Sequence, residues 1–182
     1  NSLEAAAREV RALGKGDVLT YACDLSKKVD IEKLEERLRQ DNITIDILIN
    51  NVGGPSPKTV TELTESDWES GLDLLFRSTL RLCALVLPGM RARKWGRIIN
   101  ILSTTAVEPS PALAVSSVLR AALASYAKLT AGEVSREGVT VNSVMPGGFL
   151  TARTKELMID TAARENTSVE VVQKRIEATL PL

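Results

Sequence analysis

Three mostly apolar runs constrain the fold more than any other feature of this sequence. They are DILINNV at residues 46–52, RIINILS at 97–103 and VTVNSVM at 139–145. A continuous apolar run, rather than an alternating one, is typical of a strand buried on both faces of a parallel sheet. Long stretches with apolar residues at helical spacing separate the three runs. This alternation predicts an α/β fold with a parallel sheet and helices on both of its faces.

The remaining elements are predicted from periodicity and from residues that begin or end helices. Asn1 is expected to cap a first helix that ends near residue 13. The helix over residues 67–95 is expected to break near Pro88, because proline cannot donate the helical hydrogen bond. A further strand is predicted at residues 17–25, and further helices at 29–40, 112–136, 152–163 and 168–178.

The composition excludes several classes of function. Lysine plus arginine and aspartate plus glutamate number 23 each, and this zero net charge argues against a nucleic-acid surface held by bulk electrostatics. The chain has no histidine, which excludes a Ser-His-Asp triad and any metal site built on histidine. No apolar run reaches the length of a membrane span. Cys23 and Cys83 lie far apart, as expected of reduced cysteines in a cytoplasmic protein.

Polar residues follow the carboxyl ends of the predicted strands, at Asp24, Asn50–Asn51, Ser103 and 146–151. Ligands bind at this edge of a parallel sheet, so the four segments are expected to converge there. Each segment also has a simpler interpretation. Asp24 could cap the next segment, the two glycine-containing segments could be ordinary turns, and serines are common at strand ends. Taken one at a time, the residues leave these alternatives open.

Six segments together point to a family. They are CDLS (23–26), INNVGGP (49–55), LPGM (87–90), WGRIINILS (95–103), RAAL (120–123) and GVTVNSVMPGGFLTART (138–154). With these segments the chain resembles the short-chain dehydrogenase/reductase family, particularly its 3-oxoacyl-(acyl-carrier-protein) reductase-like branch. The resemblance covers nearly the whole chain. Val52 departs mildly from the family pattern NNAG at its position.

The resemblance implies a Rossmann-type, doubly wound α/β/α fold that binds NAD or NADP and acts on a small carbonyl or alcohol substrate. It also implies a homodimer or homotetramer formed through the helices at 67–95 and 112–136, and a substrate lid at 151–180. The positions that match the family's cofactor site are Asp24 and Leu25 beside the adenine, Asn51, Val52 and Gly53 under the adenine ribose, and Pro146, Gly147, Phe149 and Thr151 around the nicotinamide.

Parts of the family fold have no counterpart in the sequence. No glycine-rich phosphate loop precedes Asn50, and the family's last strand is also missing. In the family, further strands lie between those that match residues 17–25 and 46–52, and without them these two could not share a sheet. We therefore expect residues 1–182 to be a single dinucleotide-binding domain, incomplete at both ends, from a longer protein. On its own it is expected to bind a dinucleotide poorly.

The family's catalytic residues are also largely replaced. In the family a tyrosine is the general acid, a lysine lowers its pKa and holds the nicotinamide ribose, a serine polarises the carbonyl, and an asparagine completes a proton relay. Ser103 keeps the serine position. Ser116, Arg120 and Leu75 stand at the tyrosine, lysine and asparagine positions. A serine hydroxyl is a far weaker acid than a tyrosine, and arginine stays protonated and relays no proton. Through its positive charge Arg120 is expected to bind the cofactor by holding the nicotinamide ribose.

Three functions stay open on this evidence. The first is an NAD(P)-dependent oxidoreductase in which Ser103, Ser116 and Arg120 orient a carbonyl and stabilise an oxyanion. The second is a catalytically inactive NAD(P)-binding homologue with a regulatory or structural role. The third is a lyase or hydration step in which Ser103 and Arg120 grip an anion. Oxidation or reduction of a cofactor with any substrate would distinguish the first function from the other two.

Overall fold

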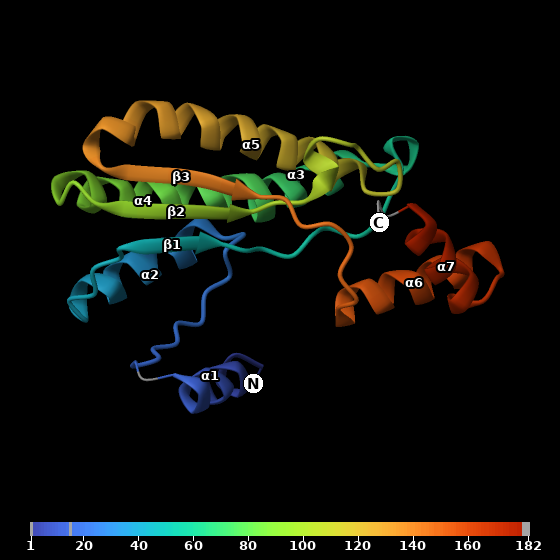
Figure 1. Cartoon of the computed structure of the whole chain (residues 1–182), viewed down its shortest axis with the longest axis horizontal. Helices are drawn as coiled ribbons and strands as arrows, with labels where there is room; N and C mark the ends of the chain where they lie inside the picture. The colour runs from blue at the N-terminus through green and yellow to red at the C-terminus, as the bar shows by residue number, and fades with distance from the viewer. Residues whose placement is uncertain (1, 15, 180–182) are drawn as a thin grey trace.

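A computed structural model describes residues 2–14 and 16–179 of the chain (Figure 1). Asn1 and Leu180, an expected helix cap and the last residue of the expected lid, lie outside the described residues. The elements, in chain order, are α1 (Ser2–Leu13), α2 (Lys28–Gln40), β1 (Ile47–Asn50), α3 (Glu65–Gly71), α4 (Ser78–Ala92), β2 (Gly96–Ile101), α5 (Ala114–Val134), β3 (Val139–Val144), α6 (Ala152–Glu165) and α7 (Val169–Thr179).

The three apolar runs form the predicted parallel sheet. Its strand order is β1-β2-β3, and both neighbouring pairs are parallel. The register places Asn50 of β1 beside Asn100 of β2, and Asn100 beside Ser143 of β3. All three strands therefore end at one edge of the sheet, where the arrowheads in Figure 1 point toward α6 and α7.

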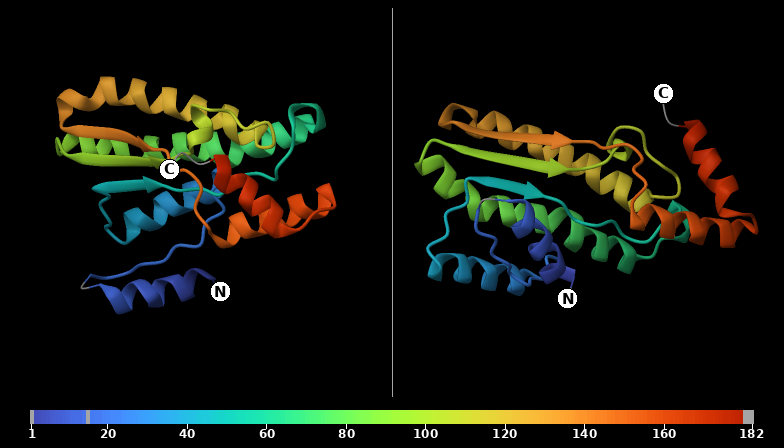
Figure 2. Two further views of the ribbon diagram at one scale, coloured as in Figure 1. Left: turned by 45° about the vertical axis from the view of Figure 1, so that its right-hand side comes forward. Right: turned by 60° about the horizontal axis from the view of Figure 1, so that its bottom comes forward.

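One face of the sheet packs against α4 and α5 (Figure 2). Met90 of α4, Ile98 of β2 and Val139 of β3 are fully buried in the core between these layers. Cys83 lies in the same core, as expected, whereas Cys23 is only partly buried. The apolar side chains of one strand face therefore fix how the two long helices lie on the sheet.

The other face of the sheet is bare within the described residues. Ile47, Ile49 and Val144 are about half exposed, at 55%, 58% and 47%. The α/β class and the parallel sheet are confirmed, and the helix layer on these three strands covers one face. No helix in the described part of the chain is both long and apolar enough to cross a bilayer.

The helices α6 and α7 form a hairpin at the carboxyl edge of the sheet (Figures 1 and 2). Met158 and Ala162 of α6 pack against Val172 of α7 in a small core of their own. Residues 145–151 connect this hairpin to β3. The hairpin thus lies where the resemblance places a substrate lid.

The strand predicted at residues 17–25 is wrong. The segment is not part of a strand, and the sheet of the described residues has three strands. An extended segment becomes a strand only when a neighbour completes its backbone hydrogen bonds. No described segment pairs with residues 17–25. Their high β-propensity is therefore not enough to make them a strand.

The break predicted near Pro88 is also wrong, because Pro88 lies inside α4. The carbonyl that its missing N–H would have reached belongs to Ala84, at an exposed helix position where water can solvate it. The irregularity lies earlier, in a π-helical turn at Leu72–Arg77 between α3 and α4. Such turns occur often at functional sites, and this one holds Leu75.

A pair of amides is buried within the sheet, beneath its carboxyl edge. Asn50 Nδ2 donates to Asn100 Oδ1 at 2.8 Å, and the two residues are 5% and 1% exposed. Asn50 Oδ1, Asn100 Nδ2 and the neighbouring Ser143 Oγ are buried without a hydrogen-bond partner among the described residues. The two amides are therefore coupled, since each loses its one partner in the pair when the other is removed.

We predict that Asn50→Val and Asn100→Val each lower the free energy of unfolding by about 1–3 kcal/mol, because each removes the hydrogen bond between the two buried amides. Asn100→Val leaves Asn50 Nδ2 with its weaker bond to Cys83 Sγ at 3.6 Å. The double variant is expected to lose less than the sum, since it removes both polar groups. Chemical denaturation measures all three. Asn142→Val, at an exposed position of β3, is the control and should change stability by less than about 0.5 kcal/mol. Additive losses would contradict the coupling.

Candidate active site

The pairing of β2 with β3 continues past the ends of both strands. Leu102 N donates to Val144 O at 2.8 Å, and Thr104 N donates to Pro146 O at 3.2 Å. Ser103 lies between these two bonds, so it is held beside the segment that follows β3. Its Oγ accepts a hydrogen bond from Thr105 N at 3.2 Å. The hydroxyl proton of Ser103 is thereby left to donate to a ligand.

The first turns of α5 are fixed against the loop that follows β1. Lys58 forms a parallel bridge with Leu113, and Lys58 O accepts from Ala114 N at 3.3 Å. Ser116 and Arg120 follow in α5, and a spacing of four residues places them on the same face of the helix. Both are only 8% exposed. The helix thus presents a hydroxyl and a guanidinium together at the carboxyl edge of the sheet.

Arg120 joins three elements through its guanidinium. Nε donates to Ser116 Oγ at 3.1 Å. Nη1 donates to the carbonyls of Ile101 and Leu102, each at 3.0 Å, and Nη2 donates to the carbonyl of Val52 at 3.4 Å. These carbonyls lie at and just beyond the ends of β1 and β2. The side chain therefore ties α5 to both strand ends.

The charge of Arg120 has no acidic partner among the described residues. Its hydrogen bonds go to one hydroxyl and three backbone carbonyls, all of them neutral. Burial lowers the pKa of the guanidinium from its ordinary value. Arginine still remains protonated at physiological pH, so the site holds a positive charge that no side chain neutralises.

A cavity of about 330 Å³ opens in front of these groups. That volume falls in the range of small-molecule pockets. The predicted site residues that line it are Ser103, Ser116, Arg120, Pro146, Gly147, Phe149 and Thr151. Residues from three separate segments, after β2, in α5 and after β3, therefore meet at one place. Of the four strand-end segments that were expected to converge, those at Ser103 and at 146–151 line the cavity.

Other predicted site residues do not line this cavity. Asp24 accepts from the hydroxyl and the backbone N of Ser26 at 2.7 and 3.1 Å and pairs with Lys27 at 3.3 Å. These contacts, Ser26 first, hold the pKa of Asp24 below its ordinary value. They match the simpler interpretation, in which Asp24 caps the turn before α2. Leu25 follows Asp24 directly.

The segment after β1 reaches the site only in part. Asn51 and Gly53 are exposed and do not line the cavity, whereas the carbonyl of Val52 accepts from Arg120. The contribution of this segment to the site is thus a backbone oxygen. This hydrogen bond uses the backbone carbonyl and does not depend on which side chain stands at position 52. The valine that departs from the family pattern therefore leaves the bond to Arg120 intact.

Six lining residues were not predicted: Gly54, Pro55, Leu102, Leu113, Thr154 and Leu157. Gly54, Pro55, Leu102 and Thr154 belong to segments that carry the family resemblance, so their positions offered a signal. Leu113 and Leu157 offered none, because an isolated leucine in a loop or a short helix has no distinguishing pattern. Hydroxyls and apolar side chains thus surround the one guanidinium of the lining.

Leu75, which the family resemblance places at the asparagine position, lies in an apolar cluster. Its side chain is fully buried and packs against Val115 and Leu119 of α5. Its carbonyl accepts from Thr79 Oγ1 at 3.0 Å. A leucine has no polar atom to pass a proton, and its apolar packing fills the position.

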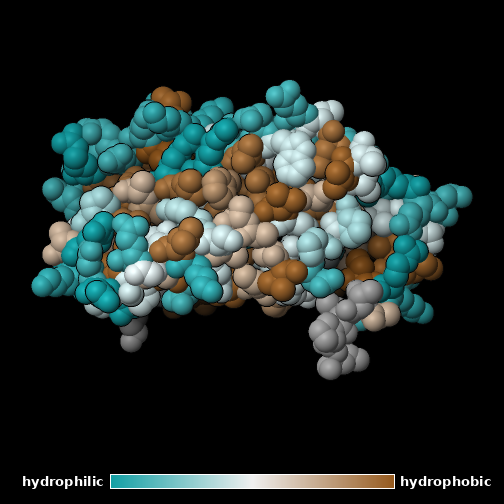
Figure 3. Space-filling view, turned by 90° about the horizontal axis from the view of Figure 1, so that it is seen from above, coloured by the Kyte–Doolittle hydropathy of each residue, from teal (hydrophilic) through white to brown (hydrophobic). Residues whose placement is uncertain are grey.

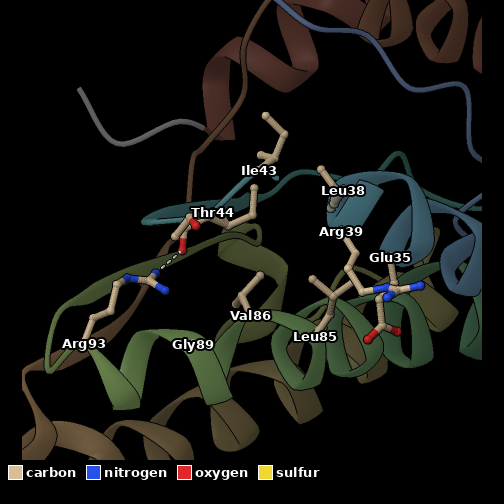
Figure 4. Close-up of a pocket in the computed structure, with 10 residues that line it drawn as sticks. Glu35, Leu38, Arg39, Ile43, Thr44, Leu85, Val86, Gly89 and Arg93 are labelled. Atoms are coloured by element: carbon tan, nitrogen blue, oxygen red, sulfur yellow. Dashed lines mark hydrogen bonds between the residues drawn. The ribbon is translucent and has the colours of Figure 1, made fainter. Parts of the chain in front are cut away.

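A second cavity, of about 270 Å³, lies between α2 and α4 (Figure 4). It is lined in part by Leu38, Ile43 and Val86 and lies by the segment that leads into β1, away from the strand carboxyl ends. Arg93 at its rim donates to the carbonyl of Ile45 at 3.0 Å and pairs with Asp46 at 3.2 Å. Because this charge is already paired, the first cavity is the better candidate for an active site.

The chain is similar to known proteins over most of its length. A sequence model described as short chain dehydrogenase matches residues 1–162. D-beta-hydroxybutyrate dehydrogenase of Cupriavidus necator is 29% identical over 174 residues, which are 95% of this chain and 67% of that protein. The 3-oxoacyl-(acyl-carrier-protein) reductase FabG of Haemophilus influenzae is 32% identical over 144 residues, 79% of this chain and 58% of that protein.

A solved structure shows the same arrangement. L-sorbose reductase from Gluconobacter frateurii, crystallised with NADPH and L-sorbose, matches with a TM-score of 0.81 and 32% identity. The match covers 88% of this chain and 61% of that one. The chain thus spans about two thirds or less of the length of these similar proteins.

An ion pair secures the loop that leads into the site. Lys58 Nζ donates to both carboxylate oxygens of Asp67, at 2.8 and 2.9 Å, and Thr64 donates to Asp67 through its backbone N and its hydroxyl. These bonds, with Lys58 the largest cause, lower the pKa of Asp67 from 3.8 to about 2. Because the folded pKa lies below the unfolded one, the stabilisation is complete above about pH 4 and is lost as the pH falls through about 2.

We predict that Lys58→Met raises the pKa of Asp67 toward about 3.9, because it removes the main group that favours the carboxylate. An NMR titration of the Asp67 carboxyl carbon measures this. Lys33→Met, which removes a lysine paired with Asp30 at 3.4 Å in α2, is the matched control and should leave Asp67 unchanged. A wild-type Asp67 that already titrates near 3.9 would contradict the assignment.

Proposed function

The chain belongs to the short-chain dehydrogenase family, and on that premise we propose that it forms one dinucleotide-binding domain of an NAD(P)-dependent oxidoreductase. The reaction is the interconversion of a small carbonyl compound, of the 3-oxoacyl type, and its alcohol. The observation that carries the proposal is the cavity at the strand ends where Ser103, Ser116 and Arg120 meet the segment after β3. The similarity to an NADPH-bound reductase supports it.

The residues of the cavity fit the nicotinamide end of such a cofactor. Gly54 and Gly147 line the cavity, and a Cβ built on either would meet no atom within 4 Å, so a flat ring has room beside the backbone. Pro146, Phe149 and Thr151 would complete that wall. The nicotinamide ring, when bound, would supply or accept the hydride. By family position, Asp24, Leu25, Asn51, Val52 and Gly53 would serve the adenosine half.

Two serine hydroxyls would bind the reacting oxygen. Ser103 and Ser116 each accept a hydrogen bond, which leaves each hydroxyl proton free to point at a substrate carbonyl. The donor to Ser116 is a guanidinium, and a charged donor makes the hydroxyl that it contacts a stronger donor in turn. The negative charge that develops on the carbonyl oxygen would therefore meet two hydroxyls with the positive charge of Arg120 behind them.

The same geometry limits the rate. A serine hydroxyl is a poor general acid, and Leu75 interrupts the relay that would resupply a proton. General acid–base catalysis contributes roughly 10²–10⁴-fold in enzymes that have it. We therefore expect turnover that depends on oxyanion stabilisation and is slower than in tyrosine-containing members of the family.

The proposed assembly is a homodimer or homotetramer built on α4 and α5. Val118 and Leu129 of α5 are 53% and 75% exposed, although both are large apolar side chains. Seen from above, where α5 lies uppermost in Figure 1, apolar residues run along the middle of the molecular surface (Figure 3). Burial of such a surface against a second copy is favourable.

A second candidate function is favoured by one observation. Every hydrogen bond of Arg120 goes to the chain itself, so the residue also acts as a structural tie. Together with Leu75 at the relay position, this suits an NAD(P)-binding homologue that has a regulatory or structural role and does not turn over.

We predict that the full-length protein containing residues 1–182 binds NADH or NADPH and oxidises it with a small oxo compound. In that protein Ser103→Ala is expected to lower kcat about 10²–10³-fold, because it removes an oxyanion donor. Cofactor fluorescence measures binding, and absorbance of the reduced nicotinamide measures turnover. Ser117→Ala is the matched control, since Ser117 lies one residue from Ser116 but accepts from Ser110 N and does not line the cavity. It should retain kcat.

The other outcomes separate the two candidates. Cofactor binding without turnover, with activity appearing only in Ser116→Tyr/Arg120→Lys, would favour the inactive homologue. Failure of wild type to bind either cofactor would overturn both.

A further inference from the structure

The positive charge of Arg120 is the most unusual electrostatic feature of the cavity. It is the one charged side chain among the residues that line it. A buried charge is normally paired, because loss of its hydration is costly. Here the neutral carbonyls accept hydrogen bonds from the guanidinium N–H groups, but they carry no negative charge to balance its positive charge.

The guanidinium also keeps bonding capacity toward the cavity. Arginine has five N–H groups, and the bonds to Ser116, Ile101, Leu102 and Val52 use four of them. One N–H of Nη2 remains, and the hydroxyl proton of Ser116 remains next to it. Ser116 Oγ lies 3.1 Å from Nε of the same guanidinium, so the two free donors belong to directly hydrogen-bonded side chains. Two neighbouring donors beside a positive charge are the usual means of binding the two oxygens of a carboxylate.

The rest of the lining favours a small monoanion. Leu102, Leu113, Phe149 and Leu157 provide apolar surface, and no second cation lines the cavity. A single positive charge balances a carboxylate, whereas a phosphate ester carries a charge of about −1.5 to −2 at neutral pH. The apolar surface suits a short carbon chain.

We propose that Arg120 and Ser116 bind a carboxylate of the substrate, so that the cavity takes short oxo or hydroxy acids. This deepens the proposed function, on which it rests for the reaction but not for the binding. With such a substrate Ser116 would donate its one hydroxyl proton to the carboxylate and not to the oxo oxygen, so Ser103 alone would hold the oxo oxygen of the same molecule. The carboxylate would fix the substrate at one end, and its carbonyl would lie within the cavity at the other.

The test is a binding titration with acetoacetate and with its neutral methyl ester, followed by calorimetry. Each is measured without cofactor and with NADP⁺, which cannot reduce the oxo group, so that no turnover occurs. Inorganic phosphate is titrated as a second anion. Wild type is expected to bind acetoacetate at least tenfold more tightly than the ester, in at least one of the two conditions, and more tightly than phosphate.

Three variants assign the effect to the residues. Arg120→Met should abolish the preference for the acid, and Arg120→Lys should retain part of it, because the charge remains without the planar fork. Ser116→Ala keeps the guanidinium and its backbone contacts, so it tests the site even if Arg120→Met does not fold, and it should reduce the preference several-fold. Ser117→Ala should leave the preference unchanged.

Equal affinity for acid and ester in both conditions, or no binding of either, would overturn the proposal. Phosphate bound as tightly as acetoacetate would also overturn it and would assign the charge to a phosphate group. These results are separate from the turnover measurement with Ser103→Ala, so failure of carboxylate binding and failure of the redox function are distinguishable.

Discussion

The hydrogen bonds that Arg120 donates to the ends of β1 and β2 are the contacts on which the site depends. Parallel strands end in carbonyl groups that no further strand residue satisfies, and α5 must be held at a fixed distance from them. One guanidinium meets the carbonyls of Val52, Ile101 and Leu102 and the hydroxyl of Ser116. Hydrogen bonds to a charged group contribute about 1.5–3 kcal/mol each, enough to offset part of the cost of burying the cation.

This contact determines the chemistry that the site can perform. Because the guanidinium is anchored to the backbone, its charge stays at the back of the cavity and acts on Ser116 and on whatever the cavity holds. Leu75 packs its apolar side chain against Val115 and Leu119 of α5, on either side of Ser116 in the sequence. The arrangement therefore favours binding and stabilisation of negative charge over proton delivery. A tyrosine–lysine pair, in contrast, favours proton delivery.

The sequence predicted those parts of the fold that depend on local pattern. The three apolar runs and the long helices were predictable because burial on a sheet and amphipathic packing leave a periodic trace. The strand at 17–25 was not, since its formation depends on a distant neighbour and not on its own residues. The position of Ser103 beside residues 146–151 followed from the parallel topology, whereas Ser116 and Arg120 were singled out by the family resemblance alone. The bonds of Arg120 to three carbonyls could not be predicted, because every residue carries a backbone carbonyl and the sequence does not show which of them accept.

The exchange that the family resemblance implies, of lysine for Arg120 and of tyrosine for Ser116, corresponds to one change of geometry. An ammonium has three donors on a point charge, and it could not reach the carbonyls of both strand ends and a helix hydroxyl in one plane. A serine at position 116 is short enough for its Oγ to lie 3.1 Å from Nε. A tyrosine hydroxyl there would extend past the guanidinium into the cavity. Replacing only one of the two residues would therefore break the present network without forming the other, which couples the two positions physically.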